Sequence, residues 1–120
     1  MQKRVLLALF AAVALGVAAS AAASAPPVGP LPAGPTSSIT TQRTELVAVA
    51  LPHRTVGRVW RIAGTVKASV VREVSEADVG SNVVIVFRAT GPGTATVKFG
   101  LTKGETTKAF EARTFRITVK

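Results

Sequence analysis

The 120-residue sequence contains no cysteine and no tyrosine, and it has a single tryptophan and a single histidine. The absence of cysteine excludes disulfide bonds, thiolate nucleophiles and cysteine-ligated metal sites. The lone histidine, His53, has no evident acidic partner in its own stretch of sequence, so nucleophilic or acid–base catalysis is a poor fit. We therefore expect a protein that is not an enzyme and that uses no cofactor or metal.

Acidic residues are scarce, with 6 against 15 lysines and arginines. The one acidic cluster, Glu73, Glu76 and Asp78, lacks the spacing of a calcium-binding loop, so we interpret it as a solvated hairpin tip. The basic residues form no dense run and have no pair of aromatic side chains for base stacking, which argues against nucleic acid as a partner. A charge-driven role would involve an anionic envelope polymer or an acidic protein.

The N-terminus has the pattern of a secretory signal peptide. Two basic residues precede an apolar run from Val5 to Val17, which gives way to small residues up to Ala25. The second half is too weakly hydrophobic for a membrane-spanning helix, which needs roughly 20 apolar residues. We expect residues 1–25 to be removed and the protein to be periplasmic or secreted, without a stable membrane span. The mature chain would keep 13 basic against 6 acidic residues, a formal charge of +7.

A proline-rich segment follows, with five of the seven prolines between Pro26 and Pro35. Because such a stretch does not build a packed element, we expect residues 26–41 to be an extended tether in front of one domain over residues 42–120. Short runs of Val, Ile, Thr and Phe between turn residues then predict an all-β domain, an antiparallel sandwich of about 6 to 8 strands rather than a barrel. The predicted strands are 45–51, 59–62, 67–73, 83–89, 93–101 and 112–120.

Alternation along these strands predicts which side chains are buried. Phe115, Ile117 and Val119 alternate with polar residues, whereas residues 83–89 are apolar almost throughout, as in a central strand. We expect the last three strands to share one sheet, with a tight hairpin turn at Thr90–Gly93. We expect the Trp60 side chain to pack into the core of the sandwich. Three longer polar segments, 52–59, 75–82 and 102–111, are expected to be exposed loops, where binding residues commonly lie.

The order of features along the domain provides a further clue. A strand ending in Leu-Pro is followed by a Thr-x-Gly loop, by Trp60 three residues after that glycine, by VGSNVVIVFRATGPGTATVKF and by a closing FRITV. In this arrangement the chain resembles the chagasin family of cysteine-peptidase inhibitors from about Thr44 to Lys120. The resemblance implies an immunoglobulin-like sandwich without disulfides that blocks the cleft of a papain-type peptidase with three neighbouring loops. We expect it to act as a monomer.

The resemblance also implies which residues bind. The first loop corresponds to residues 53–59, with Thr55, Val56 and Gly57 at the family's Thr-Thr-Gly positions, and the other two loops correspond to residues 80–82 and 103–105. The implied peptidase-binding residues are His53, Arg54, Thr55, Val56, Gly57, Gly80, Ser81, Asn82, Lys103, Gly104 and Glu105.

Two of these loops depart from the family pattern. The first lacks an Asn-Pro pair and has Val56 in place of one threonine, and the third lacks a tryptophan. Because an aromatic anchor in a desolvated pocket is worth roughly 2 to 4 kcal/mol of binding, its loss implies weaker inhibition. The alternative is a non-inhibitory immunoglobulin-like binding module of the cell envelope that recognises an anionic polymer or protein. The inhibitor hypothesis requires that the three loops share one end of the domain.

Overall fold

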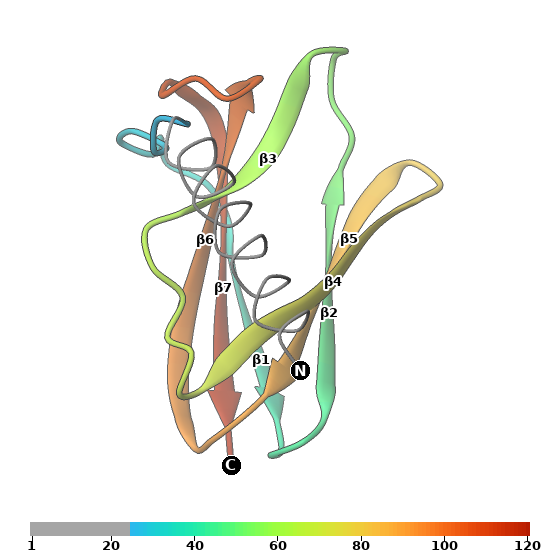
Figure 1. Cartoon of the computed structure of the whole chain (residues 1–120), viewed down its shortest axis with the longest axis vertical. Coiled ribbons are helices and arrows are strands. Elements are labelled where there is room, and N and C mark those ends of the chain that lie inside the picture. Colours follow the sequence, from blue (N-terminus) through green and yellow to red (C-terminus); the bar gives the residue numbers. More distant parts are fainter. Residues whose placement is uncertain (1–24) are drawn as a thin grey trace, which may run out of the picture.

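The computed structural model describes residues 25–120, so nearly all of the predicted signal peptide lies outside the described residues. The described part of the chain forms two packed β-sheets (Figure 1). Within it, no helix has the length and apolar character needed to cross a membrane. The strands are β1 Thr36–Thr41, β2 Leu46–Pro52, β3 Arg58–Ala63, β4 Val71–Val79, β5 Asn82–Ala89, β6 Gly93–Lys103 and β7 Ala109–Val119.

The strands divide into a four-stranded sheet, in the order β1-β7-β6-β3, and a three-stranded sheet, in the order β2-β5-β4. Every pair is antiparallel except β1 and β7, which run parallel. The buried apolar residues of both sheets form one cluster between them. The prediction of an all-β sandwich of about 6 to 8 strands is therefore confirmed.

The core follows the predicted alternation. Phe99 and Phe115 face each other from β6 and β7 with their rings edge to face and their centroids 5.8 Å apart. Phe87 of the opposite sheet and Ile117 are fully buried in the same cluster. Each such side chain contributes roughly 1.5 to 3 kcal/mol through burial alone. A cysteine-free domain of this size depends on that burial for its stability.

Strand β1 lies within the segment that the sequence predicted to be a tether. Residues Thr36–Thr41 pair with Thr114–Val119 of β7 over six residues, and Ile39 packs against the core. The last proline of the segment is Pro35, so the backbone N–H groups needed for a ladder are present from Thr36 onward. Without β1, β7 would expose an unpaired edge.

The stretch from Ser75 to Asn82 is a hairpin, not the long loop that its polarity predicted. Strand β4 continues to Val79, and only Gly80 and Ser81 connect it to β5. Strand β4 also begins later than predicted, because residues 67–70 form a turn in which Val70 N and Val71 N bond to Lys67 O. Polar side chains are tolerated in β4 because it is the outer strand of its sheet and is exposed along almost its whole length.

The prediction that the last three strands share one sheet is wrong for β5. Strand β5 is the centre of the three-stranded sheet, whereas β6 and β7 belong to the other sheet. The segment from Thr90 to Gly93 is therefore a crossover between sheets, and Thr90 is held there by bonds from its N–H to Val70 O and from its hydroxyl to Ala68 O. Two-residue periodicity shows which face a strand buries but not which sheet it joins.

Glu73 gives the fold a testable pH dependence. Partial burial, and then repulsion from Glu76, raise the pKa of the Glu73 carboxyl above its ordinary value. Because the folded state holds this proton more tightly than the unfolded chain, the contribution of Glu73 to stability falls as pH rises from the ordinary pKa to the raised one.

We therefore expect Glu73→Gln to gain stability relative to the natural protein between about pH 3 and about pH 7. The side chain is mostly exposed, so the gain should stay below about 1 kcal/mol. Urea unfolding of both proteins across this pH range measures it. A stability difference that does not change with pH would contradict the expectation.

Candidate functional site

The three predicted binding loops are joined to one another by backbone hydrogen bonds. The first loop, residues 53–57, connects β2 to β3; the second is the Gly80–Ser81 turn; the third, residues 104–108, connects β6 to β7. His53 N donates to Ser81 O at 2.9 Å, and Gly104 N donates to Gly57 O at 2.8 Å. The first loop thus lies between the other two, in the half of the sandwich away from the C-terminus (Figure 1). This is the arrangement that the inhibitor hypothesis requires.

The tip of the first loop projects into solvent. Val56 is 99 % exposed, and Arg58 N donates to Thr55 O to close a turn beneath it. Gly57 has φ +90, a left-handed conformation that side chains rarely adopt, and no atom lies within 4 Å of the position that a Cβ would take. Backbone conformation, not crowding, therefore favours glycine here, and an apolar side chain stands alone at the tip.

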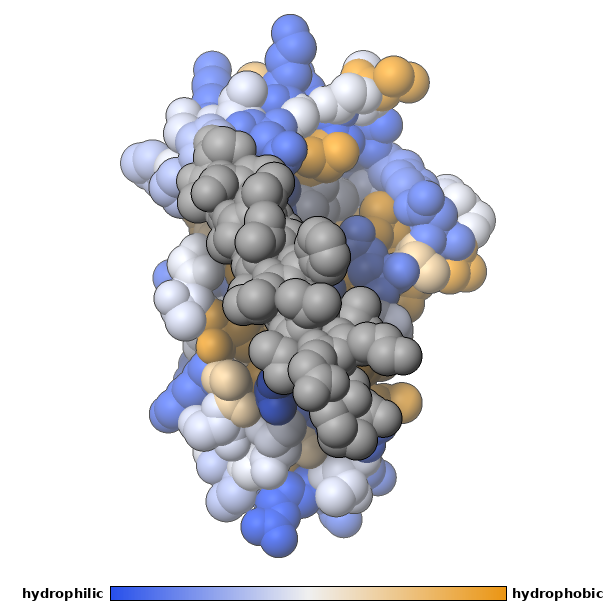
Figure 2. All heavy atoms as spheres, in the orientation of Figure 1, coloured by the Kyte–Doolittle hydropathy of each residue, from blue (hydrophilic) through white to orange (hydrophobic). Residues whose placement is uncertain are grey.

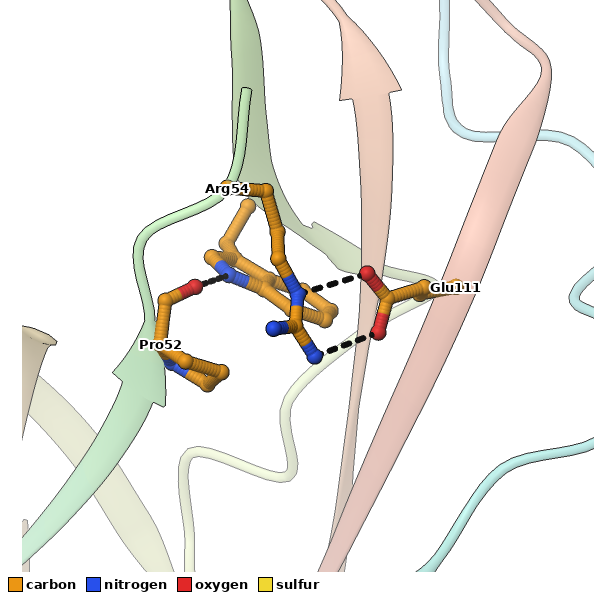
Figure 3. Close-up of polar contacts among 4 residues, drawn as sticks. Pro52, Arg54 and Glu111 are labelled. Carbon is orange, nitrogen blue, oxygen red and sulfur yellow. Dashed lines mark hydrogen bonds and ion pairs between the residues drawn. The ribbon is translucent and has the colours of Figure 1, made fainter. Parts of the chain in front are cut away.

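Two contacts attach the first loop to the sandwich (Figure 3). The Arg54 guanidinium donates to both carboxylate oxygens of Glu111 in β7, at 2.7 and 3.0 Å, and this interaction raises the pKa of Arg54 further above its ordinary value. Trp60 Nε1 donates to Pro52 O at 2.8 Å, and the Trp60 side chain packs against the core as predicted. A bidentate pair fixes orientation better than a single contact, so the start of the first loop is held firmly to the sandwich.

His53 has an acidic neighbour that its own stretch of sequence does not reveal. Its Nε2 lies 3.2 Å from Asp78 Oδ1 of β4, with both side chains well exposed. The pair lines a hollow of about 270 Å³ together with Trp60 and Arg58. Over residues 25–120, no three His, Cys, Asp or Glu side chains are grouped so that they could hold a metal ion. The contact between His53 and Asp78 links the first loop to the β4–β5 hairpin.

The third loop is shaped by its own hydrogen bonds. Lys103 is the last residue of β6, and Gly104 follows it with φ +54. The Thr102 hydroxyl donates to Gly104 O at 2.6 Å, and the Thr106 hydroxyl donates to Lys103 O at 2.7 Å. The loop is shorter than the predicted range of 102–111, because β6 and β7 both extend into that range. Its glycine and short polar residues allow a compact turn.

The proline-rich segment, residues 26–35, is extended but docked against the four-stranded sheet, and we call it the strap. Gly29 N donates to Thr107 O at 2.7 Å, in the third loop. A Cβ on Gly100 would lie 2.8 Å from Val28 Cγ1 and 2.9 Å from Leu31 Cδ2, so these two side chains rest directly on that glycine. The strap therefore differs from the free tether that the sequence predicted, because small residues in β6 and β7 leave room for it.

Arg61 of β3 ties the strap to the third loop. Its guanidinium donates to Thr106 O at 2.7 Å and also to Pro26 O. Arg61 is not among the binding residues that the sequence implied, and its role was not predicted. Because the acceptors are backbone carbonyls 45 and 35 residues away, no local pattern marks the contact.

Neither a family model nor a curated protein sequence matches the chain. Among solved structures, the cysteine protease inhibitor EhICP2 from Entamoeba histolytica is similar, with a TM-score of 0.52 over 74 % of this chain and 99 % of that chain, at 15 % sequence identity. At this identity the likeness concerns the fold. The chain thus has the β-sandwich fold of a cysteine protease inhibitor, which is the fold that its resemblance to the chagasin family implies.

Proposed function

We propose that this protein, after export, inhibits cysteine peptidases of the papain type by filling the active-site cleft with its three neighbouring loops. The observation that supports this proposal most directly is the pair of hydrogen bonds from His53 N to Ser81 O and from Gly104 N to Gly57 O, which holds the loops together. The similarity in fold to a cysteine protease inhibitor points the same way.

Inhibition of this kind needs rigidity and shape from the inhibitor, not reactive groups. Loops that are ordered before binding lose little conformational entropy on docking, so more of the contact energy appears as affinity. Here the first loop is held through Arg54 and Trp60, and its tip presents the exposed Val56 side chain beside the narrow backbone at Gly57. Such a tip can approach a catalytic thiol closely without presenting a bond to be cleaved.

The experiment is a titration of papain with the purified natural protein and with Val56→Asp. The natural protein should inhibit, and the variant should inhibit at least about 10-fold more weakly, because a carboxylate at the tip would be buried without a partner in the cleft. Stability should change by no more than about 0.5 kcal/mol, since Val56 makes no buried contact in the free protein.

Val74→Asp is the matched control. Val74 is an exposed valine at the bulge in β4, away from the loops, and receives the same change of side chain. It should inhibit like the natural protein. If the folded natural protein does not inhibit papain at high micromolar concentration, the proposed function is wrong; if both variants weaken inhibition equally, the tip is not the binding element.

A further inference from the structure

Five basic residues lie at the end of the sandwich opposite the binding loops, and we call this group the basic pole. Backbone contacts place its members together: Arg43 N bonds to Lys120 O, Thr44 N bonds to Ala89 O beside Arg88, and Val71 N beside Arg72 bonds to Lys67 O. All five side chains are exposed, and hydrophilic side chains protrude from this lower end in Figure 2. The members of the basic pole are Arg43, Lys67, Arg72, Arg88 and Lys120.

Two arginines of the basic pole are direct neighbours across a β-ladder. Arg72 of β4 and Arg88 of β5 are partners in the register, and both point away from the core. Side chains in such positions have Cβ atoms about 4.5 to 5.5 Å apart, where like charges repel. Among residues 25–120, the one intramolecular hydrogen bond of either guanidinium is a long one, 3.4 Å, from Arg88 Nη1 to Thr44 O. The repulsion between Arg72 and Arg88 therefore destabilises the folded state, and neither side chain is needed to pack the core.

The basic side chains at the two ends of the molecule differ in their intramolecular partners. At the loop end Arg54 pairs with Glu111, Arg61 donates to two carbonyls, and the Arg58 guanidinium stacks 3.8 Å from the centre of the Phe110 ring. At the basic pole, none of the five cations has a carboxylate within salt-bridge distance among residues 25–120.

The nearby acidic side chains do not neutralise the five cations of the basic pole. Glu45 uses its carboxylate to accept bonds from the Thr41 hydroxyl and Gln42 N. Glu73 follows Arg72 in the strand, so its exposed side chain points to the opposite face of the sheet, the face of its ladder partner Phe87. The positive charge of the basic pole is therefore available to a partner.

We infer that the basic pole is a second binding site, for a linear anionic polymer that carries sulfate or phosphate groups. The cations extend from the outer face of the three-stranded sheet, at Arg72 and Arg88, around to the tip of the sandwich at Arg43 and Lys120. A flexible chain can follow this corner, whereas a flat bilayer would meet only one of the two faces. Bound in this way, the protein would be held on a polyanionic matrix with its loops directed outward, so polymer binding does not depend on peptidase inhibition.

The affinity of the full mature chain for heparin and for polyphosphate, measured as a function of salt, tests the inference. With about 0.7 counterions released per contact, as for flexible polyanions, five contacts predict a roughly 100-fold loss of affinity between about 50 and about 200 mM salt. The double variant R72Q/R88Q should reduce the slope of log affinity against log salt by about 1.4. The two probes distinguish sulfate from phosphate as the preferred group.

The charge-matched control is R58Q/K108Q, which removes two cations beside Phe110 at the loop end. It should bind both polymers like the natural protein. An equal effect of the two double variants would show that net charge alone is responsible and would overturn the inference, as would tighter binding to phosphatidylglycerol vesicles than to either polymer. Circular dichroism should show R72Q/R88Q to be folded and at least as stable as the natural protein, because it removes a like-charge pair.

Discussion

Replacing Trp60 with alanine should lower the free energy of unfolding by about 3 kcal/mol. A tryptophan truncated in a core costs about 3 to 5 kcal/mol, and Trp60 is half-buried, which places the expected loss at the lower end of this range. Its indole also satisfies Pro52 O at the start of the first loop. The variant should therefore lose both the packing at this end of the sandwich and the contact that holds the loop to it.

Urea unfolding followed by circular dichroism measures this effect, since the variant lacks the only tryptophan. Trp60→Phe is the informative control: it keeps an aromatic ring but not the N–H donor, so it should cost about 1 kcal/mol. Hydrogen exchange of residues 53–57 should increase strongly in Trp60→Ala and slightly in Trp60→Phe. A loss below about 1 kcal/mol in the alanine variant would show that Trp60 does not support this end of the fold.

Substituting Leu31 with aspartate should release the strap and expose the third loop. Leu31 and Val28 are both partly buried over Gly100, and each contributes roughly 1 kcal/mol by that burial. A charged side chain at this position cannot remain on the apolar floor without a large desolvation cost, so the strap should detach with a loss of about 2 kcal/mol. Detachment would break two hydrogen bonds, from Gly29 N to Thr107 O and from the Arg61 guanidinium to Pro26 O.

Limited digestion with trypsin reports this change directly, because Lys103 and Lys108 border the third loop. Cleavage after these lysines should become several-fold faster in Leu31→Asp while the sandwich stays folded. Leu46→Asp is the matched control, since Leu46 is an exposed leucine of β2 in the three-stranded sheet, whereas the strap rests on the four-stranded sheet. If both variants are cleaved at the rate of the natural protein, the strap does not order the third loop.

Alternation within single strands made most of the fold predictable from the sequence. Phe115, Ile117 and Val119 of β7 are buried as their spacing indicated, and Val97, Phe99 and Leu101 of β6 are buried with the same two-residue spacing. This succeeds because successive side chains in a strand point to opposite faces, so one face of each strand can be identified locally. The same reasoning cannot say that β5 pairs with β2 and not with β6, because partner choice depends on how connections such as Thr90–Gly93 are directed in space.

The candidate site also contains residues that the sequence predicted and residues that it did not. The loop residues were implied by the resemblance to the chagasin family, and three of them, Gly57, Gly80 and Gly104, turn the backbone with positive φ. The side chains that support the loops were not found, because Glu111, Arg61 and Leu31 act on residues 35 or more positions away. The sequence also led us to treat the strap as a tether, since proline content predicts extension but says nothing of what an extended chain rests on.

The amino-acid sequence by itself determined that this is a cysteine-free β protein, where its strands bury one face and where its backbone turns, since these depend on residue type and two-residue periodicity. Only the tertiary structure decided which strands share a sheet, that three loops lie at one end, that the strap covers Gly100 and that five cations gather at the other end. Those features arise from contacts between residues that are far apart in the chain. The free energy of such contacts depends on how the side chains pack, and no local sequence pattern determines that packing.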